Sequence, residues 1–411
     1  MEAREKTVLV VGGGIAGVTA ALDLAEMGCQ VTLIEQDDFI GGHAARLTCK
    51  ALESCQKCNA CLVEPRLEEV LHHPAVSIMR RSRVSAITRQ GRDLVVELQR
   101  RPAYIDPQRC TACGRCLEVC PQVEAGALRR PLVPWDLPRL ALDPGVCLHF
   151  KDGKSALCVD ACPEEALDLE REGERFQLPA RAVVLASGFA PYPAGEKERL
   201  GYGVVPNVIT ALELETMLRQ EGGVRRPSDG VVPRRVGFIQ CVGSRDRQGH
   251  NYCSRVCCAY ALRLGRNLRR RLQAEVCVFY MDLQSFGHVP DRFLRAARQE
   301  LELIRSMPYD VLPGPEGTVR VPYQAQSGRA PRNKDLDLLV LSVGITPPED
   351  NAELAQGFGL SRDQHGFLCP DPGQGIFVAG TAARPMDVAE VVAHAGRAAQ
   401  ETAAYLEEMK P

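Results

Sequence analysis

The sequence predicts an α/β protein with two dinucleotide-binding-type domains in succession and a ferredoxin-like domain inserted into the first. Three observations lead to this fold class. A β-branched strand runs into a glycine-rich turn and an Ala/Leu-rich helix within 7–35. A second apolar strand and a helix follow within 236–272, and a cysteine-rich stretch at 110–162 lies between the two. Alternating strands and helices of this kind build parallel sheets with helices on their faces.

Length, charge and cysteine content limit the kinds of protein that this chain can be. Its 411 residues are enough for two or three domains, and a formal charge of -2 at pH 7 argues against a general nucleic-acid binder. No stretch approaches the roughly 18–20 continuous apolar residues that a membrane-spanning helix needs. The N-terminus begins a strand rather than a signal peptide, so we expect a cytoplasmic protein that is not integral to a membrane. The 18 cysteines then indicate metal ligation rather than disulfides.

The first glycine-rich turn has the spacing of a dinucleotide-binding loop. Gly12 permits the tight turn after the strand, Gly14 lets the backbone approach a pyrophosphate, and Gly17 lets helix and strand pack closely. The free N–H groups at the start of the helix favour phosphate. The candidate contacts there are Ile15 and Ala16. Glu35 ends the next strand, where a carboxylate would hold the hydroxyls of a ribose.

FAD fits this domain better than NAD. Two glycines follow Glu35 closely, and 375–406 reads as a strand, a Gly-Thr turn and a long Ala-rich helix that would close a flavin domain. Flavoproteins of the glutathione-reductase type often carry Gly-Asp at that turn, whereas this chain has threonine. His43 is a candidate neighbour of the flavin, although histidines at such places more often serve the core or the surface. The further candidate flavin contacts are Gly41, Gly42, His43, Ser187, Gly188, Gly380 and Thr381.

The inserted stretch contains the cysteine spacing of a ferredoxin. Its first run is C-x2-C-x2-C-x3-C-P, and its second half has three more cysteines. In two-cluster ferredoxins the fourth cysteine of each run serves the other cluster, whereas a zinc ribbon would need paired C-x2-C units. We therefore expect one cluster on Cys110, Cys113, Cys116 and Cys162, and a second on Cys120, Cys147 and Cys158. Ser155 stands where the second motif would have another cysteine, so the second cluster could have three irons, be ligated by serine or another group, or be absent.

Two further cysteine groups lie outside the inserted stretch. The first, Cys55-x2-Cys58-x2-Cys61 with Cys49 as the nearest fourth ligand, suits a cluster, with zinc or a redox-active C-x2-C pair as alternatives. The second follows the strand expected at 236–240, where a dinucleotide-binding domain would carry its glycine-rich loop. It contains four thiols, which can hold a four-iron cluster or be buried structural thiols. They are Cys241, Cys253, Cys257 and Cys258.

These assignments divide the chain into five stretches. The first part of the FAD domain with the N-terminal cysteines, the inserted ferredoxin-like domain and the continuation of the FAD domain come first. The second dinucleotide-type domain and the closing segment of the FAD domain follow. Their expected bounds are 1–101, 102–170, 171–228, 229–345 and 346–411.

The sequence resembles the A subunit of heterodisulfide reductase, an iron–sulfur flavoprotein of methanogens and other anaerobes, over nearly the whole chain. The most specific motifs are QCVGSRD with YCSRVCCAYA at 240–261, CNACLVEPRLEEV at 58–70 and CLHFKDGK at 147–154. The resemblance implies a thioredoxin-reductase-like fold with FAD, no nicotinamide site, and a four-iron cluster on the cysteines of 241–258. It also implies partners: the other subunits of a heterodisulfide-reductase-like complex, with ferredoxin or hydrogenase-type electron donors, in an oligomeric assembly.

The chain also departs from that family. Ser155 replaces a cysteine, Cys55 adds a thiol before the usual pair, and the C-terminal ferredoxin of longer relatives does not follow the last helix. The expected function is transfer of electrons between FAD and two to four 4Fe-4S clusters, with electron bifurcation as a further step or a simpler flavin-to-cluster transfer, as in the related A subunit of quinone-interacting membrane-bound oxidoreductase. The alternative is a free-standing flavin enzyme that uses NAD(P)H or a disulfide. No residue stands out as catalytic.

Overall fold

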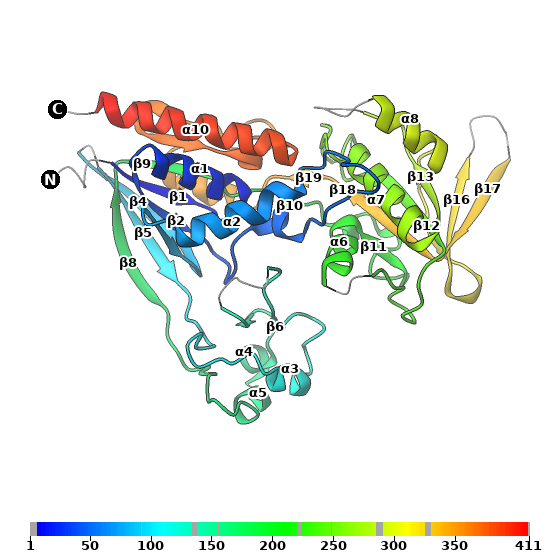
Figure 1. Ribbon diagram of the computed structural model, residues 1–411, viewed down its shortest axis with the longest axis horizontal. Helices are drawn as coiled ribbons and strands as arrows, with labels where there is room; N and C mark the ends of the chain where they lie inside the picture. Colours follow the sequence, from blue (N-terminus) through cyan, green and yellow to red (C-terminus); the bar gives the residue numbers. More distant parts are fainter. Residues whose placement is uncertain are drawn as a thin grey trace.

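Two α/β units lie side by side, and a smaller irregular module extends from the first of them (Figure 1). The computed structural model describes residues 6–91, 93–133, 138–153, 156–220, 223–247, 249–284, 291–324 and 330–409. The first strand (Thr7–Val11) and the last helix (Val388–Glu408) both belong to the first unit, so the chain leaves that unit, forms the second one and returns.

The first unit is built on a five-stranded parallel sheet. Its order is β20-β9-β1-β2-β3, and it consists of β1 (Thr7–Val11), β2 (Gln30–Ile34), β3 (Val76–Met79), β9 (Ala182–Leu185) and β20 (Ile376–Val378). One face packs on α1 (Ile15–Glu26), α2 (Val63–His72) and α10 (Val388–Glu408). The strands are mostly apolar, and β9 and β20 are entirely so, as expected for a sheet that is covered on both faces.

An antiparallel sheet covers the other face of the first unit. It contains β4 (Ser82–Gln90), β5 (Asp93–Arg100) and β8 (Glu174–Ala180), in that order. Side chains of β5 such as Val96 and Leu98 share a core with Leu9 and Leu185 of the parallel sheet. The alternation of buried and half-buried residues along β5 is typical of a sheet with one solvated face.

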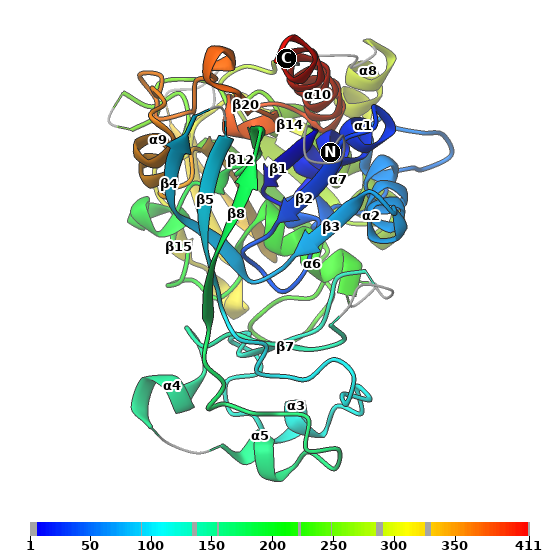
Figure 2. The same cartoon turned by 90° about the vertical axis from the view of Figure 1, so that its left-hand side faces the viewer.

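The smaller module leaves the first unit between two paired strands. Arg100 at the end of β5 pairs with Glu174 at the start of β8, and everything between them hangs below the sheet (Figure 2). The elements of the module are α3 (Arg115–Val119), β6 (Leu128–Arg129), β7 (Ala141–Leu142), α4 (Leu148–Asp152) and α5 (Leu157–Asp160). Its core consists of leucines, Ile105 and three buried cysteines, Cys116, Cys147 and Cys158.

The second unit repeats the parallel architecture. Its sheet has the order β11-β18-β12-β13-β14, with β11 (Val208–Thr210), β12 (Arg235–Val242), β13 (Glu275–Phe279), β14 (Glu302–Ile304) and β18 (Leu338–Val343). One face packs on α6 (Ala211–Gln220), α7 (Cys257–Leu272) and α8 (Asp291–Glu300). The other face packs on an antiparallel sheet of β15 (Leu312–Pro313), β16 (Val319–Gln324) and β17 (Pro331–Leu336).

Two short strands connect the units. The chain enters the second unit through β10 (Ala190–Pro191) and returns through β19 (Ile345–Thr346), and these strands pair with each other. After the return, α9 (Asn351–Phe358) packs on β4. Tyr192, directly after β10, donates its backbone N–H to Gly344 O at 2.9 Å. Backbone hydrogen bonds therefore hold together the two segments that cross between the units.

The loop that follows β12 contains a glycine that no other residue can replace without strain. Gly243 has a φ of +74°, and a Cβ atom there would lie 2.0 Å from the ring of Tyr192. Gly249 in the same loop has open space around it and no left-handed φ. The ring of Tyr192 thus fixes the course of the loop at Gly243.

We expect Gly243→Ala to lower the melting temperature of the protein by several degrees, because left-handed strain and overpacking together cost more than about 2 kcal/mol. Gly249→Ala is the matched control and should leave the melting temperature within about one degree. Thermal unfolding followed by circular dichroism measures both. Equal melting temperatures for the two variants would show that Tyr192 does not constrain Gly243.

Candidate cofactor sites

The turn between β1 and α1 leaves space where a pyrophosphate would lie. A Cβ atom on Gly12 would lie 2.2 Å from Ala186 O, and one on Gly17 would lie 1.8 Å from Gly12 O. These two glycines therefore allow the strand, turn and helix to pack. Gly14 has no atom within 4 Å of a Cβ position, and no side chain caps α1. The open space and the uncapped N–H groups fit a bound phosphate.

Glu35 is held beside the same turn. Its Oε2 accepts a hydrogen bond from Gly13 N at 2.7 Å, and its Oε1 accepts one from Asp37 N at 2.8 Å. Burial raises the pKa of Glu35 to about 7, against the opposing effect of these two backbone donors. The carboxyl group therefore lies at the end of β2, next to the glycine turn, where ribose hydroxyls could replace water as its partners.

A single cavity of about 1760 Å³ runs from this turn to the second unit. All the candidate flavin contacts predicted from the sequence line it except Gly17 and Gly380. Those two glycines act in packing, since a Cβ atom on Gly380 would lie 2.5 Å from the Cβ of Ala16. The space and its lining fit FAD, whose adenosine end would lie near Glu35.

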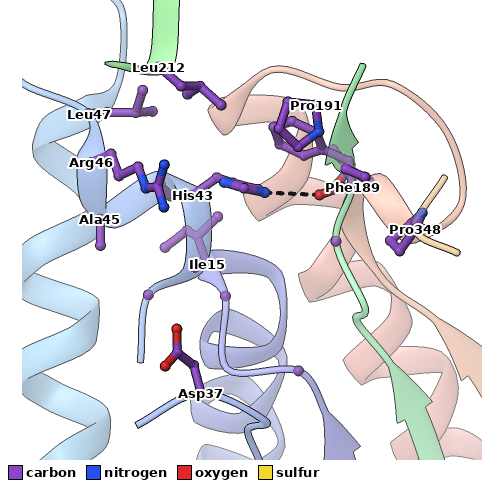
Figure 3. Close-up of a pocket in the computed structure, with 18 of the residues that line it drawn as sticks. Ile15, Asp37, His43, Ala45, Arg46, Leu47, Phe189, Pro191, Leu212 and Pro348 are labelled. Carbon is purple, nitrogen blue, oxygen red and sulfur yellow. Dashed lines mark hydrogen bonds between the residues drawn. The ribbon is translucent and has the colours of Figure 1, made fainter. Parts of the chain in front are cut away.

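His43 and Arg46 lie at the end of the cavity that faces the second unit. His43 follows the glycine pair on a short 3-10 helix (Gly42–Arg46), and its Nε2 lies 3.0 Å from Phe189 O (Figure 3). Burial, and then the charge of Arg46, lower the pKa of His43. The side chain of Arg46 also points into this space (Figure 3).

Other lining residues could not be found from the sequence, because they reach the cavity only through the arrangement of the units. Leu212 comes from α6 of the second unit, and Phe189 and Pro348 come from the segments that flank the crossing strands (Figure 3). The segment 123–132 comes from the inserted module. None of them belongs to a motif with a recognisable spacing.

The first ferredoxin-type cysteine group is gathered in one place. A small cavity in the inserted module is lined by all the cysteines expected for the first cluster. Burial, together with the neighbouring sulfurs, raises the pKa of the Cys116 thiol. The cysteines around this cavity are Cys110, Cys113, Cys116 and Cys162. Such a set of thiols fits a cluster, whose irons would balance the negative charge of the thiolates.

The second ferredoxin-type group lies next to the first. Burial, together with the neighbouring thiols of Cys147, Cys120 and Cys116, raises the pKa of Cys158 to about 11. Cys116 therefore lies close to both groups. Ser155 lies outside the described residues, so its position is not part of the structure. Cys147 and Cys158 belong to the core of the module, and the partly buried Cys120 packs against it.

The N-terminal cysteines lie against α7 of the second unit. Arg263 donates its Nε to Gln56 O at 3.0 Å and its Nη2 to Lys57 O at 3.1 Å, which fixes the backbone between Cys55 and Cys58. Positive charge surrounds this group, because Lys50 lies near Cys49 and Cys58 while Arg263 lies near Cys55 and Cys58. Cys61 is exposed on a short 3-10 helix, Ala60–Leu62, before α2.

The cysteines at the end of β12 lie at the N-terminus of α7. Cys257 and Cys258 are the first residues of that helix, Cys241 lies near the end of β12, and Cys253 comes from the loop between them. Burial, together with the neighbouring sulfurs, raises the pKa of Cys257, and it raises the pKa of Cys241 to about 11. The group occupies the carboxyl edge of the sheet, where dinucleotides bind in related folds.

The described residues contain neither a site for a single metal ion nor a helix that could span a membrane. No group of three or more His, Cys, Asp or Glu side chains is arranged there to hold a single metal ion. A cubane cluster holds each thiolate on a different iron, so its ligands lie further apart than those of one zinc ion. In the same part of the chain, every helix is too short or too polar to cross a bilayer.

Comparison with known proteins supports both kinds of cofactor. The family of FAD dependent oxidoreductases matches residues 7–111, and the 4Fe-4S binding domain matches residues 103–123. The thioredoxin reductases of Lactococcus lactis and T. acidophilum share the fold, with TM-scores of 0.54 and 0.52 at 14% and 13% identity. The alignments cover 98% of this chain in both cases, and 100% and 98% of the two reductases. The predicted fold class and the predicted FAD and 4Fe-4S cofactors are thereby confirmed.

The curated relatives match nearly the whole chain. The A subunit of the H2:CoB-CoM heterodisulfide,ferredoxin reductase of Methanothermobacter marburgensis is 33% identical over 422 residues. The iron-sulfur A subunit of the CoB-CoM heterodisulfide reductase of Methanocaldococcus jannaschii is 34% identical over 424 residues. Each alignment covers 96% of this chain and 63% of the relative, so the chain spans somewhat less than two thirds of these proteins. The resemblance predicted from the sequence motifs is confirmed.

The raised pKa of Glu35 predicts a pH dependence of FAD binding. With a pKa of about 7 in the cofactor-free protein, the carboxyl group is mostly protonated at about pH 6 and ionised at about pH 8. Since an ionised carboxylate accepts ribose hydrogen bonds better, we expect FAD affinity to rise over this interval. Fluorescence titration of FAD measures it, and Glu35→Gln should flatten the dependence.

The raised pKa of Glu35 also makes the stability of the cofactor-free protein depend on pH. The folded-state pKa of Glu35 lies above its ordinary value of 4.5, so the folded chain keeps a proton that the unfolded chain releases. This contribution to stability is complete below about pH 4.5 and is lost as the pH rises through about 7.

The matched control for the FAD titration is Glu97→Gln on β5, outside the cavity. This variant should leave the pH dependence of FAD affinity intact.

Proposed function

We propose that this chain, a homologue of the heterodisulfide reductase A subunits, is an electron-transfer subunit that passes electrons between FAD and 4Fe-4S clusters. The observation that carries the proposal is that one cavity is lined by the flavin contacts, by Cys58 and by Cys257. The FAD site and two cysteine groups thus open onto the same space. When bound, FAD exchanges two electrons, whereas a cluster carries one at a time.

The residues of the chain would hold and tune these groups. The Gly12 turn and Glu35 would bind the pyrophosphate and ribose, and the cysteines at the start of α7 would hold a cluster in place of a nicotinamide cofactor. Lys50 and Arg263 lie beside the N-terminal thiols. A positive charge near the sulfurs favours the thiolates and the reduced form of a cluster. These two side chains would therefore make the N-terminal cluster easier to reduce.

Chemistry on a final substrate belongs to other subunits in this proposal. The relatives are named as subunits of heterodisulfide reductases, and some names add ferredoxin or H2 as a reactant. We infer that this chain likewise assembles with other subunits in the cytoplasm and exchanges electrons with ferredoxin or a hydrogenase-type donor. All 18 cysteines are free in the structure, which suits a reducing compartment.

Iron analysis of the anaerobically purified protein tests the cluster assignment. We expect at least about eight irons per chain, which is the content of two four-iron clusters. Cys257→Ala should remove about four of them, with loss of one signal from the EPR spectrum of the reduced protein. Cys277→Ala, which truncates a buried thiol in the core of the same unit, is the control and should keep the full count. Fewer than about eight irons in the unchanged protein would contradict the proposal.

Reaction with NADH separates the proposal from a free-standing flavin enzyme. We expect NADH to leave the flavin absorbance unchanged on the stopped-flow timescale, because thiols replace the glycine-rich loop that would bind its pyrophosphate. Dithionite should bleach the same sample and serves as the positive control. Rapid bleaching by NADH would instead favour a reductase that uses a pyridine nucleotide.

A further inference from the structure

The inserted module forms part of the wall of the large cavity. Its segment 123–132 lines the cavity opposite the end of β2, with Val123, Leu128 and Pro131 among the lining side chains. Glu35 and Asp37 line the same region from the first unit. The module is therefore adjacent to the part of the cavity that the adenosine of FAD would occupy.

Arg129 fastens the module at this place through ion pairs with Asp37 and, at 3.8 Å, with Asp38. Arg129 of β6 donates its Nη2 to Asp37 Oδ1 at 2.7 Å and its Nη1 to Asp37 Oδ2 at 3.1 Å. Its guanidinium also lies 5.8 Å from the ring centre of Phe39. The hydrogen bonds and charge of Arg129 lower the pKa of Asp37 despite partial burial of its carboxyl group. A bidentate pair of this kind fixes orientation as well as distance.

Asp37 contacts both Arg129 and Glu35, the residue expected to bind the ribose of FAD. The backbone N–H of Asp37 donates to Glu35 Oε1, so a shift of Asp37 would move a hydrogen bond of Glu35. A second contact supports the same edge, because Arg101 donates its Nη2 to Asp38 Oδ2 at 2.9 Å. Arg129 Nε is buried and has no hydrogen-bond partner among the described residues, although the side chain lines the cavity.

We propose that the inserted iron–sulfur module is a structural part of the FAD site, and that Arg129, held by Asp37, is an FAD-positioning residue at the adenosine end. The inference rests on the proposed flavin site. Binding energy is reciprocal, so FAD that contacts the module orders it, and a module held in place strengthens FAD binding. FAD retention and the position of the module are therefore coupled.

Equilibrium binding of FAD tests this coupling. The full chain is purified anaerobically, freed of FAD with its clusters retained, and titrated with FAD while flavin fluorescence is followed. We expect Arg129→Gln to raise the dissociation constant about tenfold, the size expected for losing hydrogen bonds to a charged partner. Asp37→Asn should have a similar effect. The double variant should add little to either single one, because both remove the same interaction.

The control variant lies at the end of β5, where the module begins, away from the cavity. Arg100 donates to Glu174 at 2.9 Å where the module joins the sheet, and neither residue lines the cavity. Arg100→Gln should leave the dissociation constant within about twofold, since exposed pairs contribute little. Equal affinities for Arg129→Gln and the unchanged protein would overturn the inference. Failure of the unchanged protein to bind FAD would instead overturn the flavin proposal itself.

Hydrogen exchange gives a test that needs no variant. Addition of FAD to the unchanged protein should slow amide exchange across 123–132, because FAD would cover this segment. Exchange in β16 and β17 of the second unit, which lie outside the cavity lining, should not change. Unaltered exchange at 123–132 would overturn the inference even if the variants do not fold.

Discussion

A buried pair of opposite charges, Lys50 and Glu215, holds the two α/β units in one relative position. The side chain of Lys50 is 3% exposed and that of Glu215 is fully buried, and the two form an ion pair. Thr48 donates its backbone N–H and its hydroxyl to Glu215 Oε2, and Lys50 donates to Thr48 O at 2.7 Å. Replacing one partner of such a pair would leave an uncompensated buried charge at a cost of about 3–5 kcal/mol. The pair and the hydrogen bonds of Thr48 join the two sides of the cavity.

The same contact places the cysteine groups. Lys50 follows Cys49 in the chain, and Glu215 belongs to α6 of the second unit. Arg219 on that helix extends the junction, because it pairs with Glu64 of α2 and donates to Leu132 O of the inserted module at 3.0 Å. One helix of the second unit therefore contacts the N-terminal cysteine segment, α2 and the inserted module. The distances between cofactor sites, on which electron transfer depends, follow from this junction.

The sequence was sufficient for features that are local in the chain. The Gly12 turn, Glu35 and the cysteine runs have fixed spacings, because each spacing reflects one turn, helix or ligand geometry. The grouping of Cys162 with Cys110 was also predictable, since the pseudo-symmetry of ferredoxins links distant parts of the chain. Leu212, Arg129 and Lys50 were not, because their roles depend on how separate units face one another. No periodicity or spacing in a sequence indicates how separate units pack against one another.

The position of Cys116 bears on the doubtful second ferredoxin cluster. Leu117, the next residue on α3, lines the large cavity, and so does Val123, which follows Cys120 of the second group. Cys116 is close to both cysteine groups of the module. Both groups of the module therefore adjoin segments that line the cavity. A chain without the second cluster would still have the first group next to the cavity wall, through Leu117.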